Sequence, residues 1–179
     1  MRAGTSSITA SGNIINNNGF TGNSGTSAST IYGYFNSGSP TYEMYSNNLI
    51  TNLFISGSGT STSHNIYGMS VNTTSGSFKT ITTNTIGALL ANTTNGGNVY
   101  GIYHALGNTV EISRNKLYNM SCGGAAGNVY GIYVNSGTNN SLFNNIIGDL
   151  RTPASTSSLA ISGIYINGGT SSNIYFNTV

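Results

Sequence analysis

Three acidic residues are the candidates for acid–base chemistry or calcium binding in this chain of 179 residues: Glu43, Glu111 and Asp149. A glycoside hydrolase needs two carboxyl groups flanking one bond, and a calcium site needs several oxygen ligands in one place. The three residues fall in three different repeats of the chain, so the sequence predicts no catalytic residue, no metal site and no cofactor. Glu43 and Lys79 occupy equivalent positions in adjacent repeats and are expected to form a stacked surface ion pair, as are Asp149 and Arg151.

The two histidines, His64 and His104, are expected to be structural. His104 stands where other repeats carry Val or Ile, so we interpret it as a packed core residue whose hydrogen bonds are satisfied. His64 is assigned to a loop about one repeat away. Two histidines without a Cys or carboxylate partner make a poor zinc site.

An asparagine recurs at one position of the repeat and is followed two residues later by an aliphatic residue. The six asparagines are Asn13, Asn48, Asn84, Asn115, Asn145 and Asn177. Asn tolerates the left-handed backbone of a tight corner, and stacked Asn amides can hydrogen-bond to one another. The pattern therefore predicts a structural Asn ladder rather than a ligand site.

A second marker is a glycine within an aromatic and β-branched run, as in Val129-Tyr130-Gly131-Ile132-Tyr133. The marker glycines are Gly33, Gly68, Gly101, Gly131 and Gly163. Aromatic residues follow the glycine by two positions in four of the five repeats: Phe35, Tyr103, Tyr133 and Tyr165, with Ser70 in the remaining one. We expect these aromatic side chains to point outward, where they can stabilise the sheet, bind sugar rings or pack against another protomer.

Apolar residues around both markers alternate with period two, which is typical of strands, and no segment has a helical period. Each repeat is expected to hold three short strands and one variable polar loop, the loops falling at 54–65, 90–98, 121–128 and 151–160. A single repeat cannot bury its few aliphatic residues, whereas stacked repeats can. The sequence predicts an all-β fold: one right-handed parallel β-helix, or solenoid, of about five coils of 30–35 residues. The expected coils within this single domain, residues 1–179, are approximately 8–30, 31–65, 66–98, 99–128, 129–160 and 161–179.

Composition excludes several classes of protein. Asn, Ser, Thr and Gly make up 101 residues, whereas charged residues make up 4% of the chain. Five cations cannot form a large phosphate-binding patch, and the apolar runs are too short to cross a bilayer, so neither nucleic acid nor a membrane is an expected partner. Residues 1–4 lead into polar repeats without an apolar segment, so we expect either that a leader was removed or that the chain is part of a longer protein.

The three-strand coil with an Asn at one corner resembles the right-handed parallel β-helices of the pectin-lyase-like superfamily. Phrases such as Gly163-Ile164-Tyr165-Ile166-Asn167 are similar to those of large secreted surface proteins, including adhesins, of Bacteroidota. The resemblance covers roughly residues 8–179. It implies an extracellular or cell-surface location.

Three functions remain open at this point. The first is a non-catalytic structural β-helix: a rigid rod, an end-to-end filament or an adhesin stalk, whose partners are other copies of itself or flanking repeats. The second is a carbohydrate-binding module that uses the outward Tyr column to bind a polysaccharide. The third is a degenerate polysaccharide lyase or hydrolase.

Overall fold

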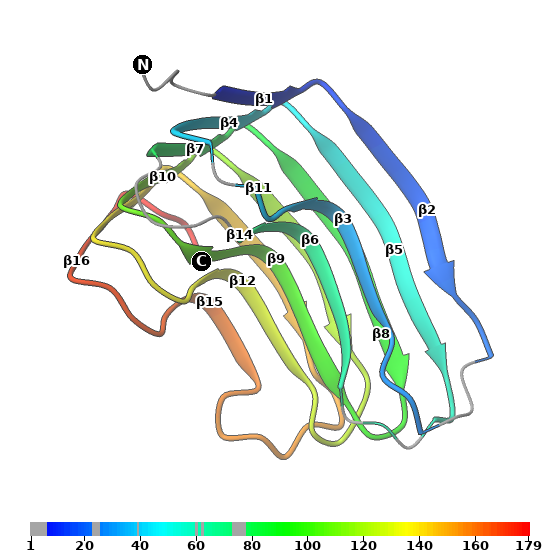
Figure 1. Cartoon of the computed structure of the whole chain (residues 1–179). Coiled ribbons are helices and arrows are strands. Elements are labelled where there is room, and N and C mark those ends of the chain that lie inside the picture. The colour runs from blue at the N-terminus through cyan, green and yellow to red at the C-terminus, as the bar shows by residue number, and fades with distance from the viewer. Residues whose placement is uncertain (1–6, 23–25, 39, 60, 62, 73–77) are drawn as a thin grey trace.

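The structure is a computed structural model that describes residues 7–22, 26–38, 40–59, 61, 63–72 and 78–179. The expectation drawn from residues 1–4 concerns a segment that lies outside the described residues. The described chain forms sixteen β-strands and no helix, and the strands make three parallel sheets that wind as a solenoid of about five coils (Figure 1). The predicted all-β parallel β-helix is therefore confirmed.

The three sheets contain equivalent strands from successive coils. Sheet A contains, in spatial order, β1 (Ser7–Ser11), β4 (Tyr42–Ser46), β7 (Phe78–Thr82), β10 (Thr109–Ser113), β13 (Asn139–Phe143) and β16 (Ser171–Tyr175). Sheet B contains β2 (Ile14–Phe20), β5 (Leu49–Gly57), β8 (Thr85–Thr93), β11 (Lys116–Cys122) and β14 (Ile146–Arg151). Sheet C contains β3 (Thr30–Asn36), β6 (His64–Asn72), β9 (Gly97–Leu106), β12 (Asn128–Val134) and β15 (Ile161–Ile166).

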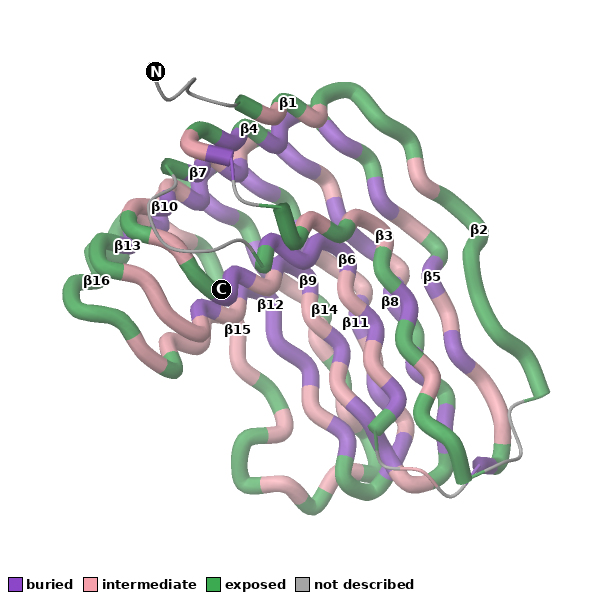
Figure 2. Tube along the Cα trace, in the orientation of Figure 1, coloured by how far each residue is buried: buried purple, intermediate pink, exposed green. Residues whose placement is uncertain are grey.

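Strand register places equivalent residues of neighbouring coils directly beside one another. One predicted interior column is paired in sheet C: Met69, Ile102, Ile132 and Ile164. The other is paired in sheet A: Ile81, Ile112, Leu142 and Ile174. These residues are fully buried in the middle coils, whereas Ile174 in the last coil is 48% exposed. Figure 2 shows the same gradient, with buried residues concentrated in the middle coils and exposed or intermediate residues in the two end coils.

The marker glycines bring sheets B and C close together. A Cβ atom on Gly68 would lie 2.7 Å from the carbonyl oxygen of Gly101, and one on Gly101 would lie 2.6 Å from that of Gly131. Either Cβ would also collide with an aliphatic side chain of sheet B, from Ile86 or Leu117. Only glycine fits this column, which explains its regular recurrence in the sequence.

Two boundaries differ from the sequence-based expectation. The segments expected as loops at 54–65 and 90–98 are shortened, because β5 and β8 continue to Gly57 and Thr93. Each of these strands passes through a residue with positive φ, Asn52 (55°) or Ala88 (51°), which bends the strand without ending it. His64, assigned to a loop, begins β6.

Candidate functional site

The six marker asparagines form a continuous ladder at the corner between sheets A and B. Each side-chain amide nitrogen donates to the Oδ1 atom of the next Asn, at 2.9, 2.8, 3.0, 3.0 and 2.9 Å from Asn13 to Asn177. Each amide nitrogen from Asn48 onward also donates to a main-chain carbonyl of the preceding coil, as Asn115 does to Ile81 at 2.8 Å. The predicted Asn ladder is confirmed, and its side chains are engaged in coil-to-coil contacts.

The corner itself is made by the residue before each ladder Asn. Positive φ values of 54–55° occur at Asn47, Thr83, Arg114, Asn144 and Phe176, and Gly12 has a φ of 69°. The expectation that the ladder Asn adopts the left-handed conformation is therefore wrong. The ladder side chain points inward to pair with its neighbours. The chain therefore turns the corner one residue earlier, at an exposed position.

The aromatic column expected from the sequence lies in sheet C, where register pairs Phe35, Ser70, Tyr103, Tyr133 and Tyr165 in that order. A second aromatic column, which sequence reasoning missed, lies beside it one residue before four of the five marker glycines, with Ser162 before Gly163. Its members are Tyr32, Tyr67, Tyr100 and Tyr130. We call the eight aromatic residues of the two columns the tyrosine face.

The rings of the tyrosine face pack mainly on one another. Tyr67 and Tyr100 stack with centroids 4.7 Å apart and planes at 6°, and Tyr103 and Tyr133 stack at 5.3 Å and 22°. Between the columns, Tyr100 and Tyr133 meet edge to face at 5.4 Å. Burial raises the pKa of Tyr67 to about 12 and also raises that of Tyr100. The inner rings therefore have neighbours on their flat faces and offer mainly their edges to a ligand.

Asparagine amides flank the tyrosine face. Asn98 donates to Asn65 and Asn128 donates to Asn98, each at 3.0 Å, in a second and shorter ladder at the start of sheet C. On the other side Asn167 donates to Asn135 at 3.0 Å. The face thus combines aromatic edges with neutral amides and contains no charged side chain.

The acidic residues are separated, and one of them is not on the surface. Glu43 and Lys79 are register partners as expected, but they are only 3% and 2% exposed, so the prediction of a surface ion pair is wrong. Both lie on the inward side of sheet A, on the same side as the buried Tyr45. Glu111 is only partly buried and accepts a hydrogen bond from Ser113 at 2.8 Å.

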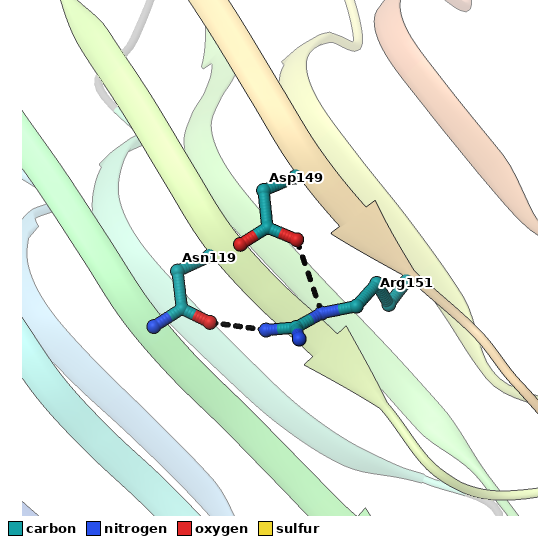
Figure 3. A network of polar contacts seen from close by, with 3 residues as sticks. All are labelled: Asn119, Asp149 and Arg151. Carbon is teal, nitrogen blue, oxygen red and sulfur yellow. Dashed lines mark hydrogen bonds and ion pairs between the residues drawn. The ribbon is translucent and has the colours of Figure 1, made fainter.

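The predicted pair of Asp149 and Arg151 is present on the outer surface of sheet B. The Arg151 Nε atom lies 3.2 Å from Asp149 Oδ1, and both side chains are 53% exposed. Arg151 also donates to the side-chain oxygen of Asn119 in the preceding coil (Figure 3). Arg151 and Leu90 line a hollow of about 320 Å³ on this surface, away from the tyrosine face.

Several of the buried ionisable groups among the described residues lie at the corner between sheets A and C. We call Asn36, Glu43, Tyr45, Lys79 and His104 the corner cluster. Asn36 donates to Glu43 at 3.2 Å and to the Tyr45 hydroxyl at 2.7 Å, and that hydroxyl donates to Glu43. No group of three or more His, Cys, Asp or Glu side chains in the described part of the chain is placed to hold a metal ion.

The histidines are buried, and one differs from its predicted state. His104 stands between Val71 and Val134 in register, as expected, and is fully buried. Among the described residues, however, neither ring nitrogen has a hydrogen-bond partner of normal geometry, although the main chain of Ser136 is placed to favour the charged ring. The ring is therefore not satisfied in the way that the sequence predicts. Burial and then the charge of Lys79 lower the pKa of His104 to about 3. The Nδ1 atom of His64 accepts a hydrogen bond from the Ser29 amide at 3.2 Å.

Comparisons with models of protein families, with characterised proteins and with solved structures gave no match. Among the described residues, no helix has the length and apolar character needed to cross a membrane. The geometry of the solenoid is therefore the basis for assigning a role to this chain.

Proposed function

We propose that this chain is a non-catalytic structural segment of an extracellular or cell-surface β-helical rod. The pectin-lyase-like character of its coil and its similarity to surface proteins of Bacteroidota, both suggested by the sequence, agree with this role. The role needs stiffness along the coil axis and a surface that stays soluble at high repeat number. It needs no catalytic group.

The observation that carries the proposal is that side chains of the same kind contact one another from coil to coil. The Asn ladder extends from Asn13 to Asn177, and aromatic rings stack across sheet C in the same direction. The side chains with the greatest capacity to bind a ligand are thus already engaged in holding one coil to the next. The neutral outer surface suits a rod, because charges repeated about every 4.8 Å would repel one another.

The end coils supply the second argument. Positions that are buried in the middle coils are exposed at the ends, as with Ile174, whose equivalents Ile112 and Leu142 are fully buried. A further coil placed on the end would cover such residues and extend the ladder. We therefore propose that the coils of a second copy, or of flanking repeats, continue the stack in a head-to-tail manner.

Negative-stain microscopy and sedimentation of the chain over a range of concentrations test self-stacking. We expect rods whose lengths are multiples of one chain and which lengthen with concentration. Ile174→Lys places a charge at the stacking end and should keep the particles at one chain length, whereas Thr138→Lys, at an exposed position away from the ends, should not. Particles of one chain length at every concentration would contradict self-stacking, and cleavage of any polysaccharide would contradict a non-catalytic role.

Carbohydrate binding by the tyrosine face is the second candidate. The observation that favours it is the pairing of aromatic edges with flanking Asn amides, which are groups that contact and hydrogen-bond sugars. A glycan array tests it. Tyr133→Ala should abolish binding, and Tyr118→Ala, on sheet B, should leave it unchanged. Equal binding by both variants, or none by the unmodified chain, would rule out this candidate.

A further inference from the structure

The corner cluster brings an amine, a carboxylate and a carboxamide together within the solenoid. Glu43 lies on β4 and Lys79 is its register partner on β7, so the two side chains enter the interior from adjacent coils. Asn36, at the end of β3, donates its amide to the Glu43 carboxylate at 3.2 Å. Lys79 and Glu43 also interact electrostatically. The carboxylate thus contacts the carboxamide, and the residue that carries it is the register partner of Lys79.

The surroundings of these groups limit access of water. Lys79 is 2% exposed and Glu43 is 3% exposed. The ring of Tyr45 is fully buried and packs edge to face on Tyr34 at 5.2 Å, which gives the cluster an aromatic wall. The amine and the carboxylate are therefore shielded from water, whereas the carboxamide of Asn36 is partly buried. Shielding of the amine favours its attack on the carboxamide over competing reactions with water.

We propose that Lys79 and Asn36 are the site of an intramolecular isopeptide bond, formed with Glu43 as the proton carrier. The Lys79 Nζ lone pair attacks the Cγ atom of Asn36 and gives up a proton to the Glu43 carboxylate. The bond between Cγ and Nδ2 then breaks, and the same proton leaves with Nδ2 as ammonia. One amide replaces another, so the step needs no oxidant, reductant or further reactant.

The electrostatics of the site support this chemistry. Burial lowers the pKa of Lys79 to about 8, and the charge of Glu43 opposes that shift only in part. A substantial fraction of the amine is therefore in the neutral, nucleophilic form under mildly alkaline conditions. The Tyr45 hydroxyl, which donates to Glu43 and accepts from Asn36, fixes the carboxylate and the carboxamide relative to each other.

The bond would join the coils of residues 31–65 and 66–98, the second and third coils, covalently. It would link the end of β3 to β7, across the segment in which the chain passes through β4, β5 and β6. Those two coils could then no longer separate by unwinding. This inference does not depend on whether the rod self-stacks or binds a polysaccharide.

Intact-mass spectrometry of the folded, purified chain tests the proposal. The expected mass is lower than the sequence mass by one ammonia, about 17 Da. Trypsin should fail to cleave after Lys79, and fragmentation should give a branched peptide joining residues 36 and 79. Lys79→Arg should restore the full sequence mass. Lys116→Arg, at an exposed lysine of sheet B, should retain the deficit.

Glu43→Gln removes the proton carrier but keeps both residues that form the bond. It should slow or abolish the loss of mass while circular dichroism still reports a β-fold. Two outcomes would overturn the proposal. One is an unmodified chain that keeps its full mass after prolonged incubation at mildly alkaline pH. The other is a deficit that persists in Lys79→Arg, which would assign it to succinimide formation at an asparagine. The unmodified chain decides the question even if a variant fails to fold.

Discussion

The Asn ladder and the corner cluster both lie inside the solenoid, but one stacks identical residues and the other stacks unlike ones. An Asn amide both donates and accepts, so each ladder residue satisfies its neighbours in both directions. In the corner cluster the columns change from coil to coil, and His104 is left with two nitrogens that have no hydrogen-bond partner of normal geometry among the described residues. Stacking of identical residues therefore satisfies the buried polar groups in the same way in every coil. Where unlike residues stack, each pair of coils needs its own hydrogen-bond arrangement.

Breaking the ladder in its middle should have the largest effect. Asn115→Leu removes the acceptor for the amide and main-chain nitrogens of Asn84 and the donor to the Ile81 carbonyl. Because these groups are buried, we expect a loss of about 4 kcal/mol in the free energy of unfolding, measured by chemical denaturation. Asn13→Leu, at the exposed end of the ladder, is the matched control and should cost clearly less. Equal costs at both positions would show that ladder continuity does not matter.

Acid should weaken the corner cluster and leave the ladder unaffected, because amides do not titrate. His104 has a pKa of about 3 when folded and about 6.5 when unfolded, so between these values only the unfolded chain binds the proton. Stability is therefore full above pH 6.5 and falls as the pH decreases toward 3, by up to about 1.4 kcal/mol per pH unit. Denaturation curves at successive pH values measure this slope. Where Lys79 carries a free amine, its charge adds to the penalty. An isopeptide bond at Lys79 would remove that charge and leave burial as the cause.

The register partners of His104 in the two neighbouring coils are both valines, Val71 and Val134, and His104→Val introduces the same residue between them. It should flatten the pH dependence between 6.5 and 3, since no other histidine shares the column. A slope that stays unchanged in the variant would assign the acid sensitivity to other groups.

The stacked rings of the tyrosine face, on the outer surface, should contribute less to stability than the Asn ladder inside the solenoid. Tyr133→Ala removes ring contacts with Tyr100, Tyr103, Tyr130 and Tyr165 and should cost about 1–2 kcal/mol in thermal or chemical unfolding. Tyr133→Phe keeps the rings and should remain within about 0.5 kcal/mol of the unmodified chain. A large loss with Phe would show that the hydroxyl, rather than ring stacking, supports the sheet.

Loss of the exposed contacts between unlike residues on sheet B should have the smallest effect on stability. Arg151→Ala breaks the exposed contacts with Asp149 and Asn119 and should lower stability by no more than about 1 kcal/mol. The difference should shrink further at high salt, because exposed charges are screened. A larger, salt-independent loss would mean that Arg151 contributes through packing beside Leu90 rather than through its charge.

Much of this arrangement follows from the spacing of the markers. Because the glycine and asparagine markers keep phase, the sequence predicts the coils, the interior columns and the ladder. For Glu43 the sequence holds two opposing signals. It lies two residues before the inward-facing Tyr45, so alternation along the strand places its side chain inside. The surface prediction follows instead from the cost of burying a charge, which the hydrogen bonds from Asn36 and Tyr45 offset in this fold.

The second column of the tyrosine face was missed for a different reason. Strict alternation would put the residues one before and one after a marker glycine on the same side. Instead, both Tyr100, one before Gly101, and Tyr103, two after it, belong to the outer aromatic face, while Ile102 is fully buried. The alternation breaks where sheets B and C meet most closely, which is a property of the stacked coils that one repeat cannot reveal.

The Asn ladder also bears on how such a chain could change length over generations. Each rung requires only another Asn in the next coil, so duplication or loss of a whole unit of 30–35 residues would leave every remaining rung with a suitable neighbour. The corner cluster has no such freedom, because Glu43 and Lys79 are complementary only when their coils are adjacent. A gene encoding this solenoid could thus gain or lose repeats in the region beyond the first coils, while the pair of coils that holds the cluster would be inherited as one block.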